Sequence, residues 1–316
     1  MPAALARRTP RAAAAASAPT GAGARRRPGR RRFRFSTGHL YVLPAFLVVA
    51  VVSLFPLVYT LWLSTRNHKL TSQNRDFAGW ENYRAVLADP AVRSAAINTT
   101  VYTASTVLLS LLFGLLLALL VNQIGWGRRI FRTAFFLPML MAPAVVGVMW
   151  RFLFNDQVGL VTLVSDALGY DGSWLGDPTL AMVAIIVVDV WQWTPFVFML
   201  LLAGLEAAPQ DPVEAARIDG ANAWQIFRNV TLPAIMPLIV IALLFRFTWA
   251  FRGFDHVYTM TQGGPGGATE LLSLAVWRRA FVNLDFGQSS AIAMLMFVLM
   301  SAIAVGLMRG TRTDRG

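Results

Sequence analysis

Long apolar segments constrain the fold of this chain more than any other feature of its sequence. Six of them reach about 17–25 residues, the length a helix needs to cross the hydrocarbon core of a bilayer. A soluble domain would have about a quarter of its residues charged, whereas this 316-residue chain is 14% charged and 56% hydrophobic. We therefore expect an all-α, polytopic membrane protein with six transmembrane helices. The predicted spans lie near residues 40–63, 97–121, 131–154, 180–203, 232–252 and 287–308.

The N-terminal tail carries most of the net charge of +12. Residues 1–38 contain ten arginines and no acidic residue. A basic segment rich in Ala, Gly and Pro cannot bury enough apolar surface to fold, so we predict a disordered tail. Because a span follows directly, the tail indicates a cytoplasmic anchor near anionic lipid rather than a nucleic-acid binder. Lys69 is the only lysine among 28 basic residues, and this arginine bias indicates a bacterium with a GC-rich genome.

The orientation in the cell membrane follows from the charges of the short loops. The connection after the second span and the C-terminal end are basic, whereas residues 155–179 contain four aspartates and no basic residue. Both termini and residues 204–231 are therefore predicted to be cytoplasmic, although the first external loop, 64–96, carries five basic residues. We divide the chain into a tail (1–38), a six-helix transmembrane domain (39–309) and a cytoplasmic C-terminal tail (310–316).

A short external helix is predicted within GLVTLVSDALG (159–169). Leu160, Leu163, Val164 and Leu168 recur at helical spacing there. This amphipathic helix would lie on the outer membrane face or over the mouth of a cavity.

The charged segment between the fourth and fifth spans predicts two short helices along the cytoplasmic face. Asp211 can cap the first helix, with Glu214 three residues on, as in a capping box. Gly220 can end that helix in the left-handed conformation. Asn222 can then cap the second helix, again with a partner, Gln225, three residues on. The segment is more ordered than a linker requires.

The surface of these helices combines small residues with an apolar ridge. Ala215, Ala216, Gly220 and Ala221 allow another backbone to approach closely, and Ile218, Ala221, Trp224 and Phe227 form the ridge. Such a surface suits either a helix-in-groove contact with a protein or a position on lipid head groups.

EAARIDGANAWQIFRNVTLPAIMP (214–237) resembles the EAA loop of the permease subunits of binding-protein-dependent ABC importers. Three further segments resemble the sugar-permease branch of maltose, trehalose and glycerol-phosphate type, and in particular the first of its paired permeases. They are FAGWENYRAVLADP (77–90), RRIFRTAFFLPMLMAPAVVGVMWRFLFNDQVGLV (128–161) and FDHVYTMTQGGPGGATELLSLAVWRRAF (254–281). The resemblance covers residues 40–308.

The resemblance implies a permease that forms half of the path for a disaccharide or oligosaccharide. Its partners would be a second homologous permease, a cytoplasmic ABC ATPase dimer, an extracellular sugar-binding lipoprotein and membrane lipids. The ATPase-coupling loop, 211–237, would contact the ATPase and pass its movement to the fifth span. The coupling residues carried over are Glu214, Ala215, Ala216, Asp219, Gly220, Ala221, Phe227, Leu232 and Pro233.

This chain is predicted not to be an enzyme and to hold no cofactor or metal. A P-loop needs Gly-Lys-Ser/Thr, and Lys69 is not in that context. ATP and Mg would therefore be bound by the partner ATPase. The chain has no cysteine, and its three histidines are far apart in the sequence, without metal-ligand spacing.

Polar and aromatic residues within the fourth and fifth spans are candidates for the substrate pathway, because polar groups in a bilayer are costly and usually functional. They are Asp189, Gln192, Trp193, Arg246 and Trp249. Hydrogen bonds between helices, interfacial tryptophans and an Asp189–Arg246 pair are the structural alternatives. An ion-coupled secondary transporter is the functional alternative, with Asp189 as its single candidate relay. A membrane enzyme would need clustered catalytic groups, which the sequence does not show.

Overall fold

The computed structural model describes residues 37–73, 75–124, 128–170 and 172–310. The chain divides into two units, residues 1–51 and 52–316. The described part of the first unit is the beginning of helix α1 (Thr37–Ser64), in the region predicted as the first span. The predicted N-terminal tail lies outside the described residues except for its last two positions, and 311–316 lie outside them as well.

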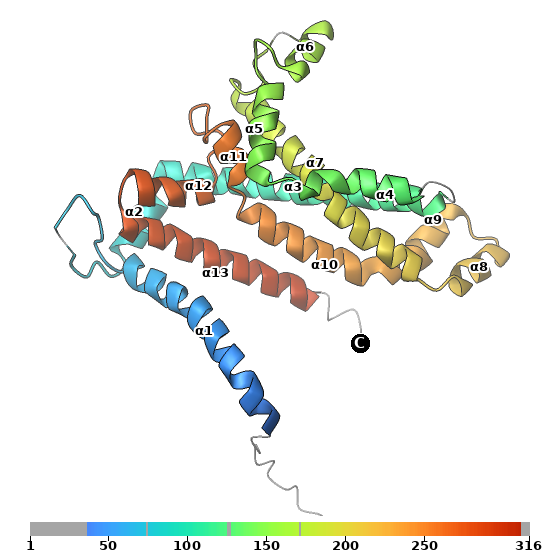
Figure 1. Cartoon of the computed structure of the whole chain (residues 1–316), viewed down its shortest axis with the longest axis horizontal. Coiled ribbons are helices and arrows are strands. Elements are labelled where there is room, and N and C mark those ends of the chain that lie inside the picture. The colour runs from blue at the N-terminus through green and yellow to red at the C-terminus, as the bar shows by residue number, and fades with distance from the viewer. Residues whose placement is uncertain (1–36, 74, 125–127, 171, 311–316) are drawn as a thin grey trace, which may run out of the picture. The chain divides into compact units, whose positions relative to one another are not determined.

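The described residues form helices and no strands, which confirms the all-α prediction (Figure 1). By length and composition, five helices could cross a membrane, and a sixth crossing is possible if one bent pair counts as a span. Besides α1, the long helices are α3 (Pro90–Gln123), α7 (Pro178–Ala207), α10 (Leu232–Phe251) and α13 (Phe286–Gly310). The shorter elements are α2 (Glu81–Ala88), α4 (Arg128–Phe136), η1 (Leu137–Leu140), α5 (Pro143–Leu153), α6 (Leu160–Ala167), α8 (Asp211–Ile218), α9 (Ala223–Ile226), η2 (Phe227–Thr231), α11 (Asp255–Met260), α12 (Leu272–Trp277) and η3 (Arg278–Val282).

The region predicted as the third span, near 131–154, is broken into two limbs rather than forming one continuous helix. Its two limbs, Ile130–Leu140 and Pro143–Leu153, are bent by 94°. Figure 1 shows α4 running along the long helices and α5 turning away from them. Proline lacks the amide proton that an uninterrupted helix needs, so Pro143 can begin α5 but cannot continue the preceding turn.

Helix α7 forms the centre of the second unit. In its most apolar stretch, 67% of the residues are buried. It packs closely on α3 at Gly114, where an added Cβ would lie 2.6 Å from a Val197 methyl carbon. Helix α7 is covered by α3, α10 and the α11 region, and its polar residues Asp189, Gln192 and Thr194 are buried.

The predicted external helix exists as α6, but its apolar side chains point away from the protein. Leu160, Leu163, Val164 and Leu168 are exposed, whereas Thr162 and Ser165 are buried. The indole of Trp174 donates to the Ser165 hydroxyl at 3.1 Å, so the polar side of α6 is the side attached to the protein.

Candidate functional site

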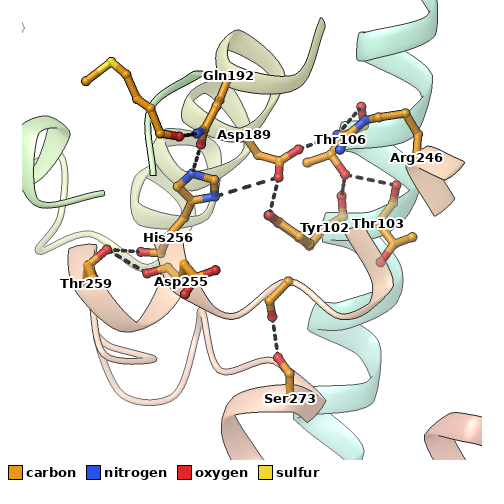
Figure 2. A network of polar contacts seen from close by, with 12 residues as sticks. Tyr102, Thr103, Thr106, Asp189, Gln192, Arg246, Asp255, His256, Thr259 and Ser273 are labelled. Carbon is orange, nitrogen blue, oxygen red and sulfur yellow. Dashed lines mark hydrogen bonds and ion pairs between the residues drawn. The ribbon is translucent and has the colours of Figure 1, made fainter. Parts of the chain in front are cut away.

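The carboxylate of Asp189, in the middle of α7, is the hub of a buried polar network (Figure 2). Tyr102 of α3 donates its hydroxyl proton to Asp189 Oδ2 at 2.8 Å, and Arg246 of α10 forms an ion pair with Oδ1. His256 Nδ1 of α11 lies 3.8 Å from Oδ2. Asp189 therefore connects four helices, and the alternative of an Asp189–Arg246 pair is the arrangement found.

A second chain of contacts leaves this hub through His256. Its Nε2 atom lies 2.6 Å from Gln192 Oε1, one turn along α7 from Asp189. The amide Nε2 of Gln192 donates to the Met141 carbonyl at 2.8 Å. Met141 lies between η1 and α5, where the third span is broken. The network thus extends from α10 to the break, as Figure 2 shows.

An open cavity of about 340 Å³ lies beside the network. Four of its lining residues are aromatic (Tyr102, Trp193, Trp249 and Phe254) and three are charged (Asp189, Arg252 and Asp255), with His256 as a further polar group and Pro143 and Gly253 completing the lining. The rings of Trp193 and Trp249 lie with their centroids 5.0 Å apart. Aromatic faces beside hydrogen-bonding groups suit a ligand that has both apolar faces and hydroxyl groups.

The structure divides the five predicted pathway residues into two groups. Asp189, Trp193 and Trp249 line the cavity. Gln192 and Arg246 are 0% exposed and lie in its wall, bonded to protein groups. Two donors of Arg246, Nε and Nη1, have no hydrogen-bond partner among the described residues.

Sequence reasoning missed four residues with polar side chains that line the cavity: Tyr102, Arg252, Asp255 and His256. The charged run 252–256, directly after the fifth predicted span, was an available signal. Nothing in the sequence could assign Tyr102, because its position depends on how α3 packs against α7.

The predicted coupling segment is a second, separate candidate site, at the opposite end of the long helices from α2 and α12 (Figure 1). None of the residues of α8 and α9 is buried. Ile218 is 86% exposed and Trp224 is 65% exposed. The predicted coupling residues are exposed or half-buried as well; they are Glu214, Ala215, Ala216, Asp219, Gly220, Ala221, Phe227, Leu232 and Pro233.

The caps of these two helices differ from each other. Asn222 and Gln225 form the predicted capping box around the start of α9. Gly220 has a φ of +81°, which confirms the predicted left-handed end of α8. Asp211, however, is the first residue of α8 and does not cap it, because the helix begins one residue earlier than predicted. Gln210 is its N-cap and makes no side-chain cap bond.

Helix α9 is continuous with the fifth span. A π-helical turn, η2, joins it to α10, and the whole stretch Ala223–Met260 is long and apolar enough to cross a membrane. Pro233 lies in the first turn of α10. A displacement of α9 would therefore be carried directly along a helix into the span that bears Arg246 and Trp249.

Outside the spans, Asp89 links the start of α3 to the η3 turn. Its carboxylate accepts from the Ala91 amide at 2.8 Å and pairs with Arg279. Burial alone would raise the pKa of Asp89, but these hydrogen bonds and the Arg279 charge outweigh it and hold the pKa below the usual value of 3.8.

Among the described residues, no three His, Cys, Asp or Glu side chains are grouped so that they could hold a metal ion. The polar groups of the cavity are instead arranged to accept and donate hydrogen bonds.

Comparison with known proteins relates this chain to one family of membrane transport proteins. Residues 110–310 match the family described as binding-protein-dependent transport system inner membrane component. A probable ABC transporter permease protein of Sinorhizobium fredii is 38% identical over 94% of this chain and 97% of its own length. A trehalose/maltose transport system permease protein of Thermococcus litoralis is 36% identical over 88% and 94%. A trehalose transport system permease protein of Mycobacterium tuberculosis is 34% identical over 88% and 89%.

The fold is similar to that of a chain in the crystal structure of a bacterial ABC transporter that imports the acidic polysaccharide alginate. The TM-score is 0.77 at 20% sequence identity, covering 89% of this chain and 96% of that chain. A second structure of an alginate transporter, in complex with a periplasmic protein bound to an alginate pentasaccharide, gives a TM-score of 0.77 at 19% identity over 88% and 94%.

Proposed function

We infer that this chain, which belongs to the family of binding-protein-dependent transport system inner membrane components and is a permease subunit of an ABC importer, forms half of the path for an uncharged disaccharide or oligosaccharide. It is a multi-pass membrane transport protein and not an enzyme. The ion-coupled secondary transporter considered as an alternative is not supported, because the family and its relatives are ABC permeases.

The Trp193–Trp249 pair at the cavity carries the sugar proposal. Two rings with centroids 5.0 Å apart form an apolar wall, and Asp189 and Asp255 lie on the same cavity as hydrogen-bond acceptors. These carboxylates can accept from sugar hydroxyl groups, and Arg252 on the same cavity can donate to hydroxyl oxygens. The relatives named for trehalose and maltose agree with a neutral substrate. In this proposal Gln192 and Arg246 shape the pathway from behind its surface.

The coupling proposal rests on the exposed surface of α8 and α9. Ile218 and Trp224 would anchor the loop in a groove of the ATPase, with Glu214 and Asp219 at the polar rim. Gly220 has no atom within 4 Å of the position of an added Cβ, so another backbone can approach there. The ATPase dimer would bind ATP and Mg, since this chain has no P-loop.

The remaining partners follow from the same function. A second homologous permease would complete the path, and an extracellular sugar-binding lipoprotein would deliver the substrate. The α8–α9 end would face the cytoplasm together with both termini, and the α2–α12 end would face outside.

The decisive experiment measures ATP-dependent uptake of radiolabelled trehalose by the assembled transporter in proteoliposomes, with the proton gradient dissipated. Trp249→Leu should lower the specificity constant for trehalose about tenfold, because a stacking surface is lost. Trp191→Leu is the matched control, since the Trp191 ring contacts Trp150 rather than the cavity. The sugar proposal fails if neither trehalose nor any other neutral disaccharide or oligosaccharide is taken up.

A further inference from the structure

The break in the third span leaves backbone polar groups without helical hydrogen-bond partners, and a side chain from another helix supplies one partner. Non-helical backbone at membrane depth is tolerated only where protein or water satisfies its polar groups. Pro143 has no amide proton to donate to the preceding turn, and the helix is interrupted between η1 and α5, at Met141 and Ala142. The Met141 carbonyl accepts its hydrogen bond from the side chain of Gln192, which lies on a different helix.

The Gln192–Met141 hydrogen bond fixes which atom donates and which accepts in the next contact, between Gln192 and His256. Because Gln192 uses its amide nitrogen for Met141, its oxygen faces His256 and must accept. His256 therefore donates from Nε2, and its Nδ1 lies 3.8 Å from the Asp189 carboxylate, beyond hydrogen-bond distance. Asp189 is in turn held by Arg246 and Tyr102.

The position of the break also determines one wall of the cavity. Pro143, the first residue of α5, lines the same cavity as Trp193 and Trp249, and His256 lines it as well. A looser Gln192–Met141 contact would let α5 begin elsewhere and change the width of the cavity.

We propose that Gln192 and His256 are positioning residues: they hold the bend between η1 and α5 and so set the shape of the cavity, which Gln192 itself does not line. His256 fixes the orientation of the Gln192 amide, which in turn donates to the Met141 carbonyl at the bend. The proposal rests on the proposed function only for its transport readout, because the bend can be measured without any sugar.

The chain contains no cysteine, so two introduced cysteines can carry the only spin labels on it. Phe152 on α5 and Leu108 on α3 are 68% and 66% exposed and provide such sites. Pulsed electron-spin distance measurements on the assembled transporter in nanodiscs should give a narrow distribution for the parent protein. Gln192→Leu should broaden or shift it, because the buried Met141 carbonyl loses its donor.

The matched control is Thr194→Val on the same helix. The Thr194 hydroxyl is buried and has no hydrogen-bond partner among the described residues, so its removal should leave the distance unchanged. His256→Leu should loosen the bend, and His256→Gln should restore it, because the glutamine amide can donate to Gln192 Oε1. If Gln192→Leu does not assemble, the His256→Leu and His256→Gln variants test whether the bend depends on the hydrogen bond between His256 and Gln192.

Transport supplies the second readout. In Gln192→Leu the KM for trehalose should rise about tenfold, as expected for the loss of one buried hydrogen bond, while the maximal rate changes less than about twofold. An unchanged distance distribution in both Gln192→Leu and His256→Leu would overturn the positioning role. Absence of trehalose uptake in the parent protein would count against the proposed substrate and leave the distance result as the test of the bend.

Discussion

The two candidate sites of this permease differ in whether their polar side chains are buried or exposed. Around Asp189, charged and polar side chains from four helices are buried and bond to one another. On α8 and α9, charged and large apolar side chains are exposed, and no residue is buried. At the interior site the side chains are held by contacts within this protein. The surface site has exposed apolar residues beside charged ones, a composition typical of a protein interface. Mutations should therefore cost folding stability at the first site and binding at the second.

The largest effect on stability is expected from breaking the interior ion pair. Asp189→Leu leaves Arg246 buried and uncompensated, which should destabilise the protein by about 3–5 kcal/mol. Because two Arg246 donors already lack partners among the described residues, the double variant Asp189→Leu/Arg246→Leu should recover most of the lost stability. Unfolding midpoints of the purified complex would measure both. A double variant as unstable as the single one would contradict this interpretation.

At the surface site, Ile218→Asp should weaken recovery of the ATPase by about thirtyfold, equivalent to roughly 2 kcal/mol for a central interface residue. The unfolding midpoint should not change, since Ile218 is 86% exposed. Leu168→Asp, on the exposed face of α6, is the control that changes an equally exposed leucine at a distant place. Equal loss of the ATPase in both variants would remove the distinction between the two regions.

The difference between the regions also explains which features could be predicted from sequence. Long apolar segments reveal spans because length and hydropathy are local properties, and the Asn222–Gln225 capping box is recognisable for the same reason. The bend near Pro143 was missed because prolines also occur in unbroken membrane helices, as Pro195 does in α7. Tyr102 and His256 reach Asp189 only through packing between helices distant in sequence. The predicted start of α8 was one residue too late, because the sequence allows either Gln210 or Asp211 to precede the helix.

The capping difference gives a smaller test within the surface site. Asn222→Ala should destabilise the start of α9 by about 1 kcal/mol, because it removes the side-chain oxygen that accepts from the backbone N–H of Gln225. Asp211→Ala should cost clearly less, since Asp211 makes no cap. Hydrogen exchange of the α9 amides should accelerate about fivefold in the first variant only. Equal acceleration of the first-turn amides of α8 in Asp211→Ala would restore the cap predicted from the sequence.

The smallest effect is expected from the Asp89–Arg279 pair. Its exposure is intermediate between those of the two sites, since the Asp89 side chain is 29% exposed. Asp89→Asn keeps an N-cap acceptor for Ala91 and removes only the charge, so the loss should be about 1 kcal/mol or less. The pKa of Asp89 is lowered from 3.8 in the folded protein. Its ionic contribution is therefore fully present above the unfolded value and is lost as pH falls through the folded pKa. The stability difference between parent and variant should stay constant from pH 7 to about pH 5 and shrink below that range. A difference that grows on acidification would mean that the Asp89 pKa is raised, and that burial rather than Arg279 dominates at this half-covered position.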